Sequence, residues 1–173
     1  VKYIRDHASE KIQVSDKQIE DRRKEIYQPM ENYEVGRNEI VGGTVSPSYI
    51  LPIHGLQRLE KIMDEYVGGI GVNYMTNEPL LMRGLHLLAT LHEDLEHIGA
   101  EDLHQLQRAW ELKHRAITSE CVTQHTLFRK ETRWPGYYYR GDHMKLDDEN
   151  WHVLTLSHRD PESGEWTMEK APV

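Results

Sequence analysis

Two consecutive stretches with apolar residues at helical spacing constrain the fold of this chain more than any other feature. In residues 78–98 the stripe consists of Leu81, Leu85, Leu88, Leu91, Leu95 and Ile98. In residues 101–129 it is sparser and consists of Leu103, Leu106, Trp110, Ile117, Cys121 and Phe128. Stripes of this kind predict amphipathic helices. Because only Gly99-Ala100 separates the two, we expect antiparallel neighbouring helices.

A third helix is predicted over residues 55–67. Its apolar positions fall on one face and are Leu56, Leu59, Ile62, Met63 and Tyr66. Gly68-Gly69 ends this helix. Thr76 or Asn77 can cap the helix over residues 78–98, and Pro79 fits its first turn, where a missing N–H costs little. The three segments together predict a three-helix bundle.

The N-terminal part differs in character. Ser15 and Gln18 form a capping-box pattern, which predicts a helix from residue 16 to 25 or a little beyond, ended or kinked by Pro29. Only Ile19 and Ile26 carry its stripe, so we expect a polar arm. A long loop, a plausible hinge or partner-facing segment, is predicted over residues 33–54, from Gly36, Gly42-Gly43, Pro47 and Pro52. Its apolar residues make it unlike a free linker: Val45, Tyr49, Ile50, Leu51 and Ile53.

The C-terminal part predicts a small β-hairpin. Residues 153–156 form one strand, residues 166–168 the other, and Asp160–Gly164 the turn. The fold class is therefore mainly α: a three-helix bundle with an N-terminal helical arm and a small C-terminal β-hairpin. We divide the chain into the arm and long loop (1–54), the bundle (55–130), and the aromatic loop with the hairpin (131–173).

Composition excludes several classes of function. A net charge of −8 argues against non-specific nucleic-acid binding, which depends on Lys and Arg neutralising phosphates. No apolar run approaches the roughly 20 residues that span a bilayer, so we expect no membrane insertion. The single Cys121 rules out an internal disulfide framework and suggests a reducing compartment, in line with a cytoplasmic protein. A charged content of 29% suggests solvated helices or a surface covered by something else. The first residue, Val1, hints at a fragment or a processed product.

Residues 131–151, which we call the aromatic loop, are the most distinctive segment. They contain Trp134, Trp151 and three consecutive tyrosines, while Pro135-Gly136 and Arg140-Gly141-Asp142 break regular structure. An ordered loop of this length is typically functional or an interface. Its arginines can stack on rings or pair with carboxylates, tying the loop to its own bundle or facing another domain, cofactor or subunit. The candidate interface residues are Arg133, Trp134, Tyr137, Tyr139, Arg140, Asp142 and Trp151.

Other chemical patterns fall short of a site. His92 and His97 are five positions apart, whereas a zinc-protease helix needs four, so a solvated acidic face is the simpler interpretation. Cys121 lies on an apolar stripe and is interpreted as a buried, inert thiol. Asp142 and the acidic run Asp147–Glu149 offer acid–base chemistry, but the run more simply starts a helical turn before Trp151. With no glycine fingerprint either, we assign no catalytic, cofactor-binding or metal-binding residue.

Several segments, taken in order, resemble one known family. They are GLQRLEKIMDEY (55–66), YMT (74–76), EPLL (78–81), LFR (127–129), ETRWPGYYYRGD (131–142) and KLDDENW (145–151). Together they resemble the C-terminal part of adenylylsulfate reductase alpha subunits, within the fumarate reductase and succinate dehydrogenase flavoproteins. The wider family carries a Glu-Ser-Arg-Gly-x-His-x-Arg-x-Asp pattern, to which Glu131, Arg133, Arg140 and Asp142 correspond. The departure at residues 134–136 favours the adenylylsulfate reductase branch.

The resemblance implies a parent enzyme that interconverts adenylyl sulfate with sulfite and AMP, in either direction, using FAD. It implies a sulfite–flavin adduct, and electrons from a beta subunit with two iron–sulfur clusters. The FAD-binding and catalytic parts would precede this chain, whose expected role is structural: packing on the FAD-binding domain of the same subunit, with the arm reaching toward a partner. The rival interpretations are a stand-alone helical interaction module and a His/Glu metal protein.

Overall fold

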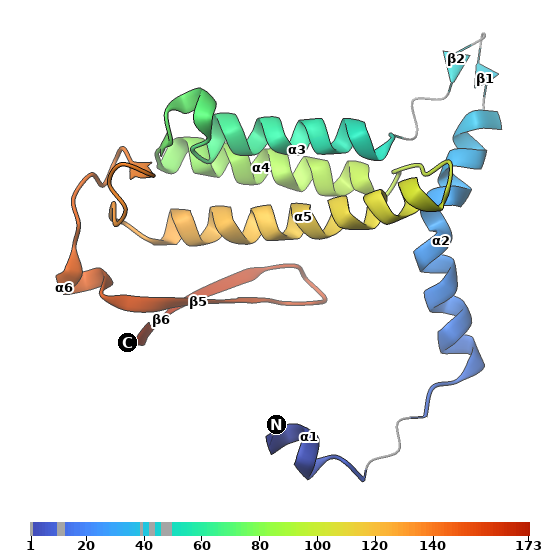
Figure 1. Ribbon diagram of the computed structural model, residues 1–173, viewed down its shortest axis with the longest axis horizontal. Helices are drawn as coiled ribbons and strands as arrows, with labels where there is room; N and C mark the ends of the chain where they lie inside the picture. The colour runs from blue at the N-terminus through green and yellow to red at the C-terminus, as the bar shows by residue number, and fades with distance from the viewer. Residues whose placement is uncertain (1, 10–12, 39, 42–43, 46–49) are drawn as a thin grey trace.

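Three helices pack side by side to form the body of the molecule (Figure 1). The computed structural model describes residues 2–9, 13–38, 40–41, 44–45 and 50–173. The bundle consists of α3 (Pro52–Tyr66), α4 (Glu78–Leu95) and α5 (Leu103–Phe128), in agreement with the prediction to within three residues at each end. Asn77 caps α4 as predicted, its side-chain oxygen accepting from the Leu80 N–H at 3.0 Å. Asp102 caps α5 in the same way.

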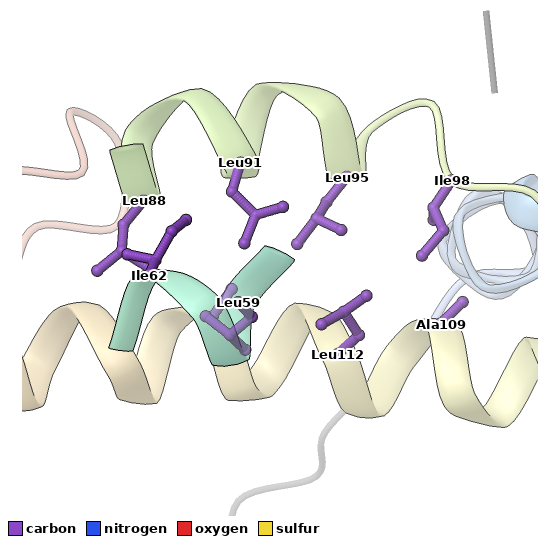
Figure 2. Packing of buried hydrophobic residues seen from close by; sticks show 9 residues of the cluster. Leu59, Ile62, Leu88, Leu91, Leu95, Ile98, Ala109 and Leu112 are labelled. Atoms are coloured by element: carbon purple, nitrogen blue, oxygen red, sulfur yellow. The ribbon is translucent and has the colours of Figure 1, made fainter. Parts of the chain in front are cut away.

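The core lies where the three helices meet, and Figure 2 shows its side chains interdigitating. Leu88 and Leu91 of α4 are fully buried (0% exposed), as is Ile98 beyond the end of that helix. Leu59 and Ile62 of α3 pack against them. The rest of the cluster comprises Leu95, Ala109, Leu112 and Ala116. The leucine spacing of α4 therefore identifies the core correctly.

The buried face of α5 differs from the predicted stripe. Leu103 and Ile117 lie on the outside, at 65% and 39% exposure, and Trp110 is half-buried. The inward face consists of Leu106, Ala109, Leu112, Ala116 and Thr123. Small residues at this seam let the helices approach closely, so the face that packs carries a weaker hydrophobic signal than the face that does not.

The N-terminal helix is longer than predicted. A short helix, α1 (Lys2–Asp6), precedes α2 (Asp16–Asn38), which begins with the expected capping box between Ser15 and Gln18. Pro29 does not end α2, because tertiary contacts hold the helix at that point. The Pro29 carbonyl accepts from the Ala100 N–H at 2.8 Å, and the Ile26 carbonyl accepts from Trp110 Nε1 at 3.0 Å. Figure 1 shows the first half of α2 leading away from the bundle.

The long loop predicted over residues 33–54 is correspondingly shorter. Its first residues belong to α2, and β1 (Ile40–Val41) pairs antiparallel with β2 (Thr44–Val45). Gly42, Gly43, Pro47 and Tyr49 lie outside the described residues. Ile50 bridges to Ile98, and its carbonyl accepts from the Gly99 N–H at 2.6 Å. At least this end of the segment therefore packs on the bundle, as its apolar content suggests.

The C-terminal hairpin is confirmed and extends beyond its predicted strands. The strand β5 (Val153–Arg159) pairs antiparallel with β6 (Trp166–Pro172), with Val153 opposite Pro172 and Arg159 opposite Trp166. The hairpin runs along α5 (Figure 1). The two ring nitrogens of His125 join it to α5, at 3.1 Å from Thr155 Oγ1 and 2.9 Å from Ser157 Oγ. None of the helices described here is long and apolar enough to cross a membrane.

Candidate functional site

The aromatic loop crosses the end of the bundle. A parallel two-residue pairing joins β3 (Met75–Thr76), in the connection between α3 and α4, to β4 (Tyr139–Arg140). The Tyr139 N–H donates to the Tyr74 carbonyl at 2.8 Å, and the Gly141 N–H donates to the Thr76 carbonyl at 2.7 Å. The connection also contains a single turn of 3-10 helix, η1 (Ile70–Val72). Backbone pairing therefore fixes the loop to the two helices that precede α5.

Two glycines shape this contact. Gly136 adopts a φ of +94°, which residues other than glycine rarely adopt. At this turn the N–H groups of Tyr137 and Tyr138 both donate to the Trp134 carbonyl at 3.1 Å. Gly68 has a φ of +97°, and a Cβ placed on it would lie 2.6 Å from the Tyr138 ring. The Tyr138 hydroxyl donates to the Val67 carbonyl at the end of α3. Burial raises the pKa of this tyrosine.

Arg140 is the side chain that holds the loop to α5. It is 2% exposed, and its Nη1 donates to three carbonyls at the C-terminus of α5, those of Thr126, Leu127 and Arg129. The last carbonyls of a helix lack intrahelical partners and carry a partial negative charge. A buried guanidinium can supply both the missing hydrogen-bond donors and a compensating positive charge, because it is always charged and offers several donors in a fixed plane.

Asp142 completes the arrangement at the opposite kind of helix end. Its two oxygens accept from Arg140 Nε and Nη2, both at 2.9 Å, and one also accepts from the Glu78 N–H at 2.9 Å. Glu78 is the first residue of α4, where the helix dipole favours a negative charge. The Arg140–Asp142 pair therefore joins the C-terminus of α5 to the N-terminus of α4. The Arg140 hydrogen bonds, opposed by burial and reinforced by Glu78, lower the pKa of Asp142 to about 2.

This lowered pKa predicts a loss of stability in acid. The unfolded-state pKa of Asp is about 3.9, above the folded value, so the contribution is complete above about pH 5. It disappears as the pH falls from about 4 toward 2. We expect the free energy of unfolding, measured by urea titration, to fall more steeply over this window in the unsubstituted chain than in Asp142→Asn. Glu162→Gln, in the exposed hairpin turn, should keep the steeper dependence. Parallel curves for all three proteins would contradict this assignment.

A second ionic cluster surrounds Glu131, whose side chain is completely buried. Its carboxylate accepts from Arg129 Nη1 at 2.5 Å, from Arg133 Nε at 2.6 Å and Nη2 at 3.0 Å, and from the Asp147 N–H at 3.0 Å. Burial alone would raise the pKa of Glu131, but the hydrogen bonds from Arg133, Asp147 and Arg129 outweigh it, and the net pKa is lowered. Asp147 caps α6 (Asp148–Trp151), which confirms the helical turn predicted before Trp151.

The candidate interface residues differ in how far they are exposed. Arg140 and Trp151, at 2% and 7% exposure, lie inside the chain. Trp151 contacts Phe128 edge-on and lies under the Lys170 ammonium at 3.5 Å. Trp134 and Tyr137 lie outside, at 70% and 79% exposure. The remaining candidates are intermediate or bonded within the loop: Arg133 and Asp142 as described above, and Tyr139 through its hydroxyl, which accepts from the Gly136 N–H.

Beside Trp134 a groove of about 280 Å³ opens between the loop, α5 and the hairpin, with His125, Arg129 and Arg133 among its lining. The two guanidinium groups are engaged by Glu131 and by carbonyls, and the imidazole of His125 is bonded to hairpin hydroxyls. The basic side chains of the groove are therefore already bonded within the chain, and Trp134 lies at its edge.

Sequence reasoning overlooked two side chains that hold this site together. Thr132 is 4% exposed, and its Oγ1 accepts from the Arg140 N–H at 3.0 Å and donates to the His143 carbonyl at 2.9 Å. Arg129 donates to the carbonyls of Trp151 and Val153. The available clue was the spacing of Arg129, Glu131 and Arg133, which places a carboxylate between two cations.

His92 and the cysteine contact neighbouring elements. His92 is half-buried, with Nε2 3.4 Å from Glu120 Oε2 of α5, whereas Glu93, Glu96 and His97 are exposed, in line with the predicted solvated acidic face. Cys121 is half-buried rather than fully buried, with Sγ 3.8 Å from Ser157 Oγ. Glu78, Asp142 and His143 bring potential metal ligands within 4.8 Å of one another. Because both Asp142 oxygens already accept from Arg140, this cluster serves the helix junction.

Comparison with known proteins gives a consistent placement. The sequence pattern of the family described as "Fumarate reductase flavoprotein C-term" matches residues 56–173. The adenylylsulfate reductase alpha subunit of Megalodesulfovibrio gigas is 43% identical over 147 residues, which are 85% of this chain and 22% of that protein. The solved adenylylsulfate reductase of the hyperthermophile Archaeoglobus fulgidus matches with a TM-score of 0.90 and 49% identity, over 99% of this chain and 27% of that one.

A more distant structure, the quinol fumarate reductase of E. coli, shares the fold, with a TM-score of 0.61 and 20% identity over 94% of this chain and 26% of that one. This chain spans between 22% and 27% of the length of these three relatives. The bundle from residue 56 onward, the aromatic loop and the hairpin fall within the matched residues 56–173, and the chain belongs to the family of fumarate reductase flavoprotein C-terminal domains.

Proposed function

We propose that this chain is the C-terminal helical domain of the alpha subunit of an adenylylsulfate reductase, the enzyme that interconverts adenylyl sulfate with sulfite and AMP. The observation that carries the proposal is the contrast in identity. The chain is 49% identical to the Archaeoglobus enzyme over 99% of its length, but 20% identical to the fumarate reductase of the same fold. The Trp134-Pro135-Gly136 departure from the wider pattern supports the same branch.

The cofactors of such an enzyme would lie outside this chain. A site for FAD needs a phosphate-binding element and a cleft that encloses the flavin, and ligand pockets of that class measure roughly 300–1,000 Å³. The groove beside Trp134 is about 280 Å³, and its arginines already bond carboxylates and carbonyls of the chain. This groove therefore does not fit FAD on its own. In the proposal, FAD belongs to the preceding part of the cytoplasmic subunit, and the iron–sulfur clusters belong to a partner beta subunit.

The role of this chain is then structural. We keep the division into arm and loop (1–54), bundle (55–130), and aromatic loop with hairpin (131–173). The part-buried pairs of Arg140 with Asp142 and Arg133 with Glu131 hold the loop in one shape. Trp134 and Tyr137 project from it and would contact the FAD-binding domain or the beta subunit. Rigid exposed aromatic side chains supply large contact areas at low entropic cost, which is why Trp and Tyr are enriched at the centres of interfaces.

The test substitutes Trp134 in the full-length alpha subunit produced with its iron–sulfur partner. Because Trp134 is 70% exposed, Trp134→Ala should leave the fold of this domain intact. It should weaken assembly by about 30-fold, the effect of losing one aromatic hot spot worth roughly 2 kcal/mol. Association is measured by titrating the subunits. Activity is measured as sulfite and AMP formed from adenylyl sulfate, with a chemical reductant supplying the two electrons that each turnover consumes. Trp134→Phe should retain most of the affinity.

Leu103→Ala provides a matched control, because Leu103 is similarly exposed (65%) but begins α5, while Trp134 follows the C-terminal end of that helix. An unsubstituted enzyme that forms no sulfite or AMP would overturn the assignment of function. An enzyme that is active and assembles equally well with Trp134→Ala would overturn the interface alone.

A further inference from the structure

In the part of the chain that the structure describes, the apolar side chains of the first half of α2 remain exposed. Every residue from 16 to 28 is exposed, and Pro29 is the first buried one. Ile19 and Ile26 are 56% and 41% exposed, and Tyr27 is 42% exposed. Figure 1 shows this part of α2 projecting past the bundle, whereas its second half contacts the α4–α5 connection.

The apolar residues of this half-helix share a seam. Ile19 and Ile26 are seven positions apart, close to two helical turns, so they lie on the same side. Isolated helices of about 12–15 residues are marginal in water, and most helices in proteins gain their stability from packing an amphipathic face. An exposed seam of this kind on a helical segment indicates that a further surface packs against it.

We propose that the Ile19–Ile26 seam docks on the preceding part of the same polypeptide, an inference that rests on the proposed function as part of a longer subunit. The match to the Archaeoglobus enzyme extends over 99% of this chain at a TM-score of 0.90, so it takes in α2. That relative holds the same arm within a chain of which this one covers 27%. The family match begins at residue 56, so α2 precedes the segment that this match covers.

Covalent continuity favours this occupant over a second copy of the chain. A tethered surface is present at an effective concentration in the millimolar range for short connections, far above that of a free partner. A modest apolar seam is then sufficient for docking. The occupant is a complementary apolar groove on the flavin-binding portion of the subunit.

Trypsin provides a direct test, because Arg22, Arg23 and Lys24 lie within the exposed half of α2. Cleavage there requires the helix to open locally, and its rate reports how tightly the helix is held. In the full-length alpha subunit alone, the bonds after these residues should be cleaved about 10–100-fold more slowly than in the Ile19→Glu variant, the range expected for removing one buried isoleucine. Mass spectrometry identifies the cleaved bonds.

Gln28→Glu is the matched control, since it adds the same charge on the opposite side of the helix, at roughly 3.6 residues per turn, and is also exposed. It should be cleaved as slowly as the unsubstituted subunit. Should Ile19→Glu lower expression, the milder Ile19→Ala/Ile26→Ala pair should show the same faster cleavage.

Equal cleavage of the unsubstituted and Ile19→Glu subunits would overturn the proposal. So would protection that appears only at high protein concentration, which indicates a second copy, or only after the beta subunit is added. The readout does not depend on catalysis. A subunit that protects α2 but is inactive toward adenylyl sulfate would support the docking and refute the proposed reaction, whereas an active subunit with an unprotected α2 would refute the docking alone.

Discussion

Replacing Arg140 with alanine should destabilise this chain by about 3–5 kcal/mol, because its side chain is 2% exposed and its bonds to helix carbonyls and to the partly exposed Asp142 are lost together. The substitution leaves Asp142 without its counter-charge and removes the donor to three α5 carbonyls. For a chain of this size each kcal/mol corresponds to roughly 2–4 °C, so the midpoint of thermal unfolding should fall by on the order of 10 °C. Circular dichroism at pH 7 measures the shift.

The control for this prediction is another arginine in an ion pair. Arg58 pairs with Asp94, but both side chains are more than 40% exposed, and exposed pairs contribute about 0–1 kcal/mol. Arg58→Ala should therefore stay close to the unsubstituted chain. Arg140→Lys should fall between the two, because it keeps the charge but loses the planar set of donors. A loss for Arg140→Ala no larger than that of Arg58→Ala would refute the role of Arg140 as the anchor of the aromatic loop.

Replacing Leu91 with alanine should cost about 2–5 kcal/mol through lost burial and the cavity left behind. Leu91 is 0% exposed and belongs to the core cluster formed by all three helices. Met82→Ala, on the same helix at 58% exposure, should change the free energy of unfolding by less than about 0.5 kcal/mol. Leu91→Met, nearly equal in volume, should cost less than about 1.5 kcal/mol. Urea unfolding followed by tryptophan fluorescence compares the three. Similar losses in Leu91→Ala and Met82→Ala would place the core elsewhere.

The bundle was predictable because its signal is local. The α4 leucines recur at the helical period, and Gly68, Asn77 and Gly99 mark where helices end or begin. The packing face of α5 was not predictable from hydrophobicity, since Ala109, Ala116 and Thr123 are buried while Leu103 and Ile117 are exposed. Which face of a helix packs depends on the shape of the neighbouring helices, and small residues on that face give only a weak hydrophobic signal in the sequence.

In the aromatic loop, too, the sequence does not predict which side chains are buried. The sequence marks Arg140 and Trp134 as equally notable, yet the structure buries the first and exposes the second. The burial of Arg140 follows from carbonyls that α5 leaves unpaired and from the Asp142 carboxylate, which the first N–H of α4 holds in place; both the carbonyls and this N–H are positioned by tertiary structure. Pro29 is a further example. Of the helix end or kink that local rules predict there, the end is wrong: α2 continues to Asn38, and carbonyls at this point bond Ala100 and Trp110.

The junction between Glu78 and Asp142 also sets the timing of folding. The two residues are 64 positions apart. Such a contact is slow to form in an open chain, because closing the loop costs conformational entropy before the contact contributes any stabilising energy. Once α3, α4 and α5 have packed, the end of α5 already lies beside the α3–α4 connection, and only the short segment after Phe128 remains to be placed. During synthesis from the N-terminus, Trp134 and Tyr137 therefore reach their final positions only after the bundle has closed.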